Sequence, residues 1–196
     1  MPLTSRHPRR TLAVVLAVLA LALGGCGSDD STPQADGTSL LAEHDLAGLD
    51  ARGIIERLDA MPVADRPADL LASVRPDVLV VSDGDERETE LSMPGDEVYV
   101  SVAPYREQTH ECHFHSLTTC LGELGNTPVR VELVASDGQV LVDEERTTFD
   151  NGFVGMWVPK GIEATLTIRH RDTTATSIIS TKDADDPTCI TTMQLA

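Results

Sequence analysis

The spacing of apolar residues changes after Pro76, and this change constrains the fold of the 196-residue chain more than any other feature. Beyond this point apolar residues alternate with polar ones or form short runs, each bounded by Asp, Gly, Asn or Pro. Such a pattern is typical of β-strands. The expected strands cover residues 78–82, 88–92, 97–103, 129–135, 140–144, 153–158, 164–170, 176–181 and about 190–195. Asp137-Gly138 and Asn151-Gly152 predict tight hairpin turns between strands.

The preceding segment, 39–76, has helical spacing instead. Apolar residues recur three to four positions apart between Leu40 and Leu58, and Asp50 is placed to cap a second helix. A further short helix is expected from Pro67 to Val74, ending before Pro76. The sequence therefore predicts an α+β fold: a small N-terminal helical unit at 39–76, then a β domain at 77–196 that forms an antiparallel β-sandwich or a partly open barrel.

Residues 1–25 are typical of a secretory signal peptide. They contain no acidic residue, carry three arginines, and are apolar from Leu12 to Leu23. This apolar run is too short to span a membrane. We therefore expect an exported, extracytoplasmic protein.

The signal peptide ends in Leu23-Gly24-Gly25-Cys26, which resembles the lipobox of bacterial lipoproteins. This resemblance implies lipidation of Cys26 and attachment to the cell membrane through the lipid alone. Residues 26–38 are expected to form the lipid anchor and a flexible tether, because they combine Gly, Ser, Asp and Pro without an apolar pattern.

The chain is strongly acidic. It has 15 basic and 32 acidic side chains, and removal of the three signal-peptide arginines would lower the net charge from −17 to −20. An acidic surface of this size repels phosphate backbones and argues against nucleic acid as a partner, whereas it attracts cations in a general way.

Besides Cys26, the chain has three cysteines. An odd number leaves one thiol unpaired outside the cytoplasm, where thiols normally form disulfides. The three are Cys112, Cys120 and Cys189. The first two lie in a short stretch that also holds three of the histidines, His110, His113 and His115. Thiolate and imidazole are the ligands that Cu(I) and Zn(II) prefer, so this stretch predicts a site for a soft or borderline metal such as copper or zinc.

The spacing of these cysteines demands a folded-back segment. A straight helix would separate Cys112 from Cys120 by roughly 12 Å and a strand by roughly 26 Å, too far for a shared metal or a disulfide. Cys189 must then arrive from the last strand. In an extended stretch His113 and His115 share one face, and we predict these two as metal ligands together with the three cysteines. A structural disulfide between Cys112 and Cys120 is the alternative for that pair.

The stretches APYREQTHECHFHSLTTCLGEL, FDNGFVGMWVP and DDPTCITT, with the helical opening from Leu49 to Asp77, resemble the CueP family of bacterial extracytoplasmic copper-binding proteins. This resemblance implies periplasmic copper binding, reduction of Cu(II) to Cu(I), and delivery to a copper enzyme such as Cu,Zn superoxide dismutase. It also implies a disulfide reductase as a partner, and it places the family's key cysteines on Cys112, Cys120 and Cys189.

Redox chemistry provides a role for all three cysteines. Two thiolates that close to a disulfide release two electrons, enough for two reductions of Cu(II), while the third thiol remains a ligand for the soft Cu(I) ion. The cysteines are therefore predicted as both reductants and ligands, whether or not the reduction turns over as an enzymatic reaction. Two rival hypotheses are a metal-free thiol–disulfide redox protein and a β domain with a structural zinc site.

Overall fold

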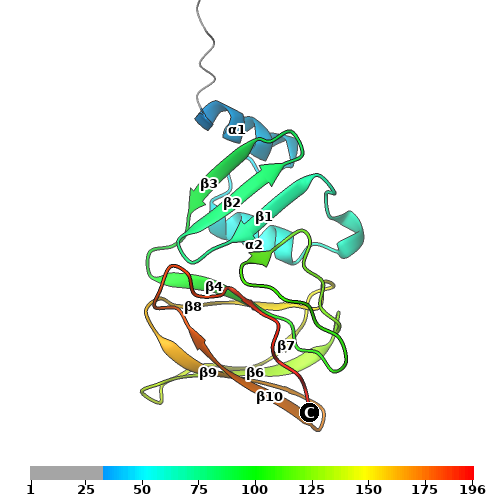
Figure 1. Ribbon diagram of the computed structural model, residues 1–196, viewed down its shortest axis with the longest axis vertical. Helices are drawn as coiled ribbons and strands as arrows, with labels where there is room; N and C mark the ends of the chain where they lie inside the picture. Colours follow the sequence, from blue (N-terminus) through cyan, green and yellow to red (C-terminus); the bar gives the residue numbers. More distant parts are fainter. Residues whose placement is uncertain (1–32) are drawn as a thin grey trace, which may run out of the picture. The chain divides into compact units, whose positions relative to one another are not determined.

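The computed structural model describes residues 33–196 (Figure 1). This part begins with helices α1 (Pro33–Glu43) and α2 (Ala51–Asp59) and a short 3-10 helix, η1 (Val63–Asp65). Strands form the remainder. The predicted signal peptide and Cys26 lie outside the described residues. Within residues 33–196, no helix is long and apolar enough to cross a membrane.

The first sheet packs against the helices. Its strands are antiparallel and run in the order β3 (Glu88–Ser92), β2 (Val78–Asp83), β1 (Leu70–Val74) and β5 (His115–Ser116). Ile54 and Leu58 of α2 are buried against Leu79 of β2, while α1 packs on β3. The N–H of Gly53 donates to Asp50 Oδ1 at 2.8 Å, so the predicted helix cap is present.

The other two sheets form a sandwich. One has the order β11, β4 and β8, with bounds Cys189–Ile190, Glu97–Val102 and Val154–Pro159. The other has the order β10, β9, β6 and β7, with bounds Thr173–Ser180, Glu163–His170, Pro128–Ala135 and Val140–Thr147. Valine, leucine and isoleucine side chains from both sheets fill one core. The pairing is antiparallel except that β11 runs parallel to β4, which places Cys189 beside Ser101.

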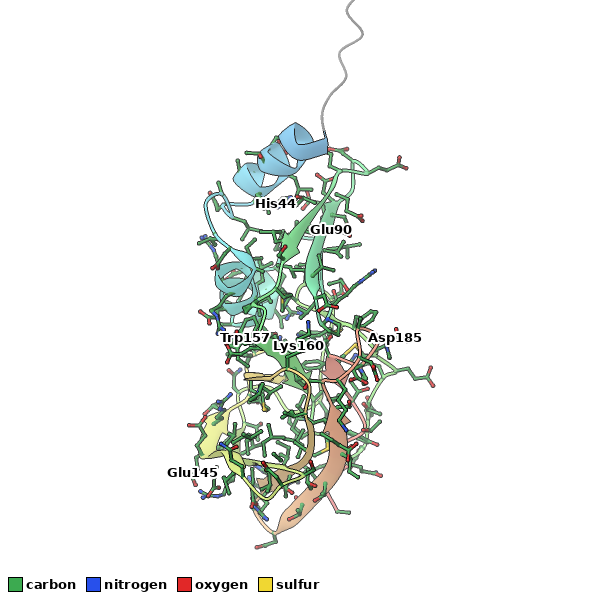
Figure 2. The ribbon with its side chains drawn as sticks, turned by 90° about the vertical axis from the view of Figure 1, so that its left-hand side faces the viewer. His44, Glu90, Glu145, Trp157, Lys160 and Asp185 are labelled. Atoms are coloured by element: carbon green, nitrogen blue, oxygen red, sulfur yellow. A yellow bond between two sulfur atoms is a disulfide. The ribbon has the colours of Figure 1, made fainter. Side chains whose placement is uncertain are left out.

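Strand β4 belongs to two cores because its side chains alternate between opposite faces. Val100 and Val102 are buried in the sandwich core, while Tyr99 joins the core under the helices. Trp157 of β8 pairs with Tyr99 at a ring distance of 5.0 Å and lies against Arg52 of α2. Figure 2 shows Trp157 at the level where the helical layer meets the sandwich, and in Figure 1 β4 and β8 form the side of the sandwich that faces the helices.

The α+β class is confirmed, in the form of a sandwich, but the helical unit is smaller than predicted. The segment expected to form a helix from Pro67 to Val74 contains strand β1 instead. Leu70, Ala72 and Val74 are buried whereas Leu71 is exposed, which is strand alternation. In so short a segment the apolar spacing fits a helix as well as a strand. The hydrogen bonds to β2 select the strand.

Part of the segment predicted as a tether is helical. Helix α1 begins at Pro33, inside the segment 26–38 that composition assigned to a flexible linker. Gly37 is buried beside Thr89 of β3, so packing on the sheet stabilises a helix that has little local propensity.

The two predicted turns differ in what they connect. Asp137-Gly138 joins the paired strands β6 and β7 with Gly138 at φ 89°, as expected of a hairpin. Asn151-Gly152 also forms a tight turn, with Gly152 at φ 81°. However, β7 and β8 belong to different sheets, so this turn carries the chain from one sheet to the other.

Candidate metal centre

The fold brings the three predicted sulfurs together. Cys112 and Cys189 form a disulfide although 77 positions separate them in the sequence, and their Cα atoms lie 5.6 Å apart. Cys120 is the free cysteine among residues 33–196, and its Sγ lies 3.5 Å from that of Cys112. The alternative pairing, a structural disulfide between Cys112 and Cys120, is not the one found.

Backbone hydrogen bonds explain how these distant segments meet. The carbonyl of His113 accepts the N–H groups of Thr188 and Cys189, both at 3.0 Å, and thereby fixes the C-terminal segment beside the loop. After β5 the loop turns back, because the N–H of Cys120 donates to the carbonyl of Ser116 at 3.2 Å. The predicted reversal between Cys112 and Cys120 is therefore present.

The three histidines of the stretch have different surroundings. His115 is fully buried, with Nδ1 3.9 Å from Cys189 Sγ. His113 is exposed, and its Nε2 lies 2.9 Å from the carbonyl of Asp185, a residue on an outer loop (Figure 2). His110 is partly buried beside Phe153.

Two overlapping groups of metal-ligating side chains result. His115, Cys120 and Cys189 form a fully buried group, and their ligand atoms lie within 4.8 Å of one another. The second group, His110, Cys112 and Cys120, meets the same distance limit and is partly exposed. His113 belongs to neither group. When the Cys112–Cys189 disulfide is reduced, each group offers mixed thiolate and imidazole donors, which suit Cu(I) and Zn(II).

A buried carboxylate holds His115 in place. Asp59, the last residue of α2, is fully buried, and its Oδ1 lies 3.0 Å from His115 Nε2. Tyr99 Oη donates to Oδ2 at 2.6 Å, and Asn151 Nδ2 donates to Oδ1 at 2.8 Å. Burial alone would raise the pKa of Asp59, but the hydrogen bonds from His115, Tyr99 and Asn151 outweigh it and hold the pKa below its usual value. The carboxylate is therefore ionised.

The Asp59 carboxylate affects the protonation of His115 and, through His115, that of Cys120. Burial opposes protonation of His115, yet the hydrogen bonds and charges of Asp59 and Cys120 raise its pKa to about 9. Burial likewise opposes ionisation of Cys120, yet His115, with a smaller contribution from His110, lowers the thiol pKa to about 7. The site thus supplies a thiolate near neutral pH, and the thiolate is the form that binds metal and transfers electrons.

Sequence reasoning missed Asp59, Tyr99 and Asn151. Asp59 did have a signal, because it lies four residues after Ile55 on the buried face of α2. A carboxylate on such a face is rarely tolerated without partners. Nothing in the sequence shows that the partner is His115, which is 56 positions away.

Two comparisons with known proteins gave matches. The family profile described as "Periplasmic copper-binding protein CueP" matches residues 53–194. A crystal structure described as that of S.CueP is 37% identical in sequence and superposes with a TM-score of 0.75. The match covers 81% of this chain and 96% of that one. No curated protein matches the chain. The profile match spans most of the chain and includes every cysteine and histidine of the metal centre, so the chain belongs to the CueP family.

Proposed function

We propose that this protein binds copper outside the cytoplasm, reduces Cu(II) to Cu(I) with cysteine thiols, and holds or delivers the Cu(I) formed. The observation that carries the proposal is the sulfur arrangement: Cys112 and Cys189 are joined, and the free thiol of Cys120 lies 3.5 Å from Cys112 Sγ. Membership of a family described as copper-binding and periplasmic supports the choice of metal and compartment.

The electron balance follows from the observed disulfide. In the reduced protein, the thiolates of Cys112 and Cys189 each give one electron to a Cu(II) ion. The products are two Cu(I) ions and one Cys112–Cys189 disulfide. Cys120 is not consumed and remains a sulfur ligand, with His115 as an imidazole ligand beside it. Copper binding to these groups releases the protons that they carry.

The cycle requires a partner, because the disulfide must be reduced before another two Cu(II) ions can react. A disulfide reductase would supply those electrons, and an extracytoplasmic copper enzyme, such as Cu,Zn superoxide dismutase, would accept the Cu(I). This cycle could serve copper tolerance or copper supply.

The protein would be held at the membrane by a lipid on Cys26. Intact-mass analysis of the mature protein tests this by showing an acylated chain that begins at Cys26.

An anaerobic titration tests the redox proposal. Fully reduced, metal-free protein mixed with excess Cu(II) should form about two equivalents of Cu(I) and lose two thiols per chain. Peptide mapping should then find Cys112 joined to Cys189 and Cys120 free. The double variant Cys112→Ser/Cys189→Ser should reduce little copper. The matched control Cys120→Ser should keep the electron count but retain Cu(I) poorly against a chelator.

Other outcomes favour the rival functions. Copper binding without loss of thiols would remove the reductase role. Preferential retention of Zn(II) with all thiols intact would support a structural zinc site instead. Disulfide exchange with a partner protein, with no affinity for Cu(I), would support a metal-free redox protein.

A further inference from the structure

Cys120 belongs to both groups of ligands, and we propose that copper occupies two successive positions that share this sulfur. The outer position consists of His110, Cys112 and Cys120, and the inner one of His115, Cys120 and Cys189. Copper arrives at the outer position and moves to the inner one, where it is retained. This inference rests on the proposed copper binding and adds a route and an order of ligands to it.

The inner position is closed to solvent. His115 is 0% exposed, Cys189 2% and Cys120 8%. The ring of Phe153 packs on His115 at 4.6 Å between centroids, and Asp59 occupies its second nitrogen. A hydrated copper ion therefore cannot meet His115 first, although the sequence pattern predicted this histidine as a metal ligand.

The outer position is open. A cavity of about 360 Å³ reaches it, with His110 and Cys112 on its wall and Thr191 and Thr192 contributed by the C-terminal segment. A second cavity, of about 240 Å³, is also lined by His110. His110 thus borders both cavities, and Cys112 borders the first.

A further observation supports His110 as a ligand. Its Nε2 atom is buried and has no hydrogen-bond partner within residues 33–196. Leaving a buried polar atom unpaired costs about 1–3 kcal/mol, so such atoms in native proteins usually have a use. A metal ion bound through this imidazole would satisfy it.

The shared sulfur explains how the ion can pass inward. When the Cys112–Cys189 bond is reduced, Cys120 can stay bound while His115 replaces His110 and Cys189 replaces Cys112. The ion is then never without a thiolate ligand, which avoids the large cost of a bare charge in an apolar interior. No electron is transferred in this step, so it can be studied with Cu(I) alone.

Transfer kinetics test the order of the two positions. Reduced protein is mixed anaerobically with Cu(I) held by a weak chromogenic chelator, and the release of chelator is followed by stopped flow. His110→Ala should slow acquisition several-fold and leave the final Cu(I) affinity close to that of the wild type. His110→Gln, which keeps a polar side chain, should do the same. Cys189→Ser should acquire copper at the wild-type rate but lose about tenfold or more in final affinity.

His113→Ala is the matched control, since His113 lies in the same loop but contacts Asp185 and belongs to neither group. Its kinetics should equal those of the wild type. Wild-type rates in both His110 variants, or a parallel loss of rate and affinity in the His110 and Cys189 variants, would overturn the two-position route while copper binding stands. Failure of the wild type to take up any Cu(I) would instead overturn the proposed function itself.

Discussion

At the scale of single residues, Asp59 determines which nitrogen of His115 faces the sulfurs. An ionised carboxylate only accepts hydrogen bonds, so the nitrogen 3.0 Å from it, Nε2, must carry a proton. Nδ1 is then directed at Cys189. Asp59 is therefore placed to act as a positioning residue for the proposed ligand His115, in the way that carboxylates orient metal-binding histidines in other sites.

Replacing Asp59 by Asn tests this role. The amide has nearly the same size but can donate to Nε2, which would shift the proton of neutral His115 to Nδ1 and block the metal-facing nitrogen. We expect Asp59→Asn to lower the Cu(I) affinity by about tenfold or more in a competition titration. Nitrogen NMR of His115, recorded above its pKa of about 9 where the ring is neutral, should show the changed tautomer. Tyr99→Phe removes a bond to the same carboxylate without touching His115, so its tautomer should persist. An unchanged tautomer and affinity in Asp59→Asn would contradict the role.

The thiol of Cys120 should titrate near neutrality. His115 and His110 lower its pKa to about 7 from an ordinary value of 9.0. A lowered thiol pKa means that the reactive thiolate appears as the pH rises through about 7. Alkylation of Cys120 in the oxidised, metal-free protein, followed by mass spectrometry of its peptide, should therefore reach half its maximal rate near pH 7. In the unfolded protein, or after His115→Gln, the midpoint should move upward; a native midpoint near 9 would refute the shift.

At the scale of elements, alternation or short apolar runs predicted β2 to β4 and the longer strands of the sandwich, because each has enough residues for the pattern to show. The wrong predictions arose where a segment is too short for its apolar spacing to distinguish a helix from a strand. Leu70, Leu71 and Val74 fit a helix or a strand, and pairing with β2 selects the strand. β5 has only two residues, His115 and Ser116, and exists because β1 offers it a partner.

Close packing between β4 and β8 supports the network around Asp59. Gly155 of β8 has no room for a side chain, since a Cβ there would collide with Tyr99 Oη, the group that donates to Asp59. We expect Gly155→Ala to destabilise the fold by about 1–3 kcal/mol, as overpacked cores do. Urea unfolding measures the loss. Gly95→Ala is the matched control, because nothing lies within 4 Å of a Cβ at that position. Equal stabilities of the two variants would show that Tyr99 moves aside freely.

At the scale of the whole described chain, the site lies where several elements meet. α2 contributes Asp59, β5 contributes His115, and β11 contributes Cys189. The cysteines could be found from their number and from the resemblance to CueP. Their pairing and the carboxylate behind them could not, because both depend on contacts between elements that only the assembled sheets create.

This arrangement couples the redox state to stability. The Cys112–Cys189 bond closes a loop with a sequence separation of 77 residues, which the chain-entropy account values at about 4 kcal/mol. The reduced, copper-reactive form should therefore unfold at lower urea concentration than the oxidised form. Saturating Cu(I) should restore part of the difference, because a ligand that binds only the folded state stabilises it. Cys120→Ser is the control: it should show the same gap between redox states but a smaller gain from Cu(I). Equal urea midpoints for oxidised and reduced wild type would show that the disulfide constrains the unfolded chain little.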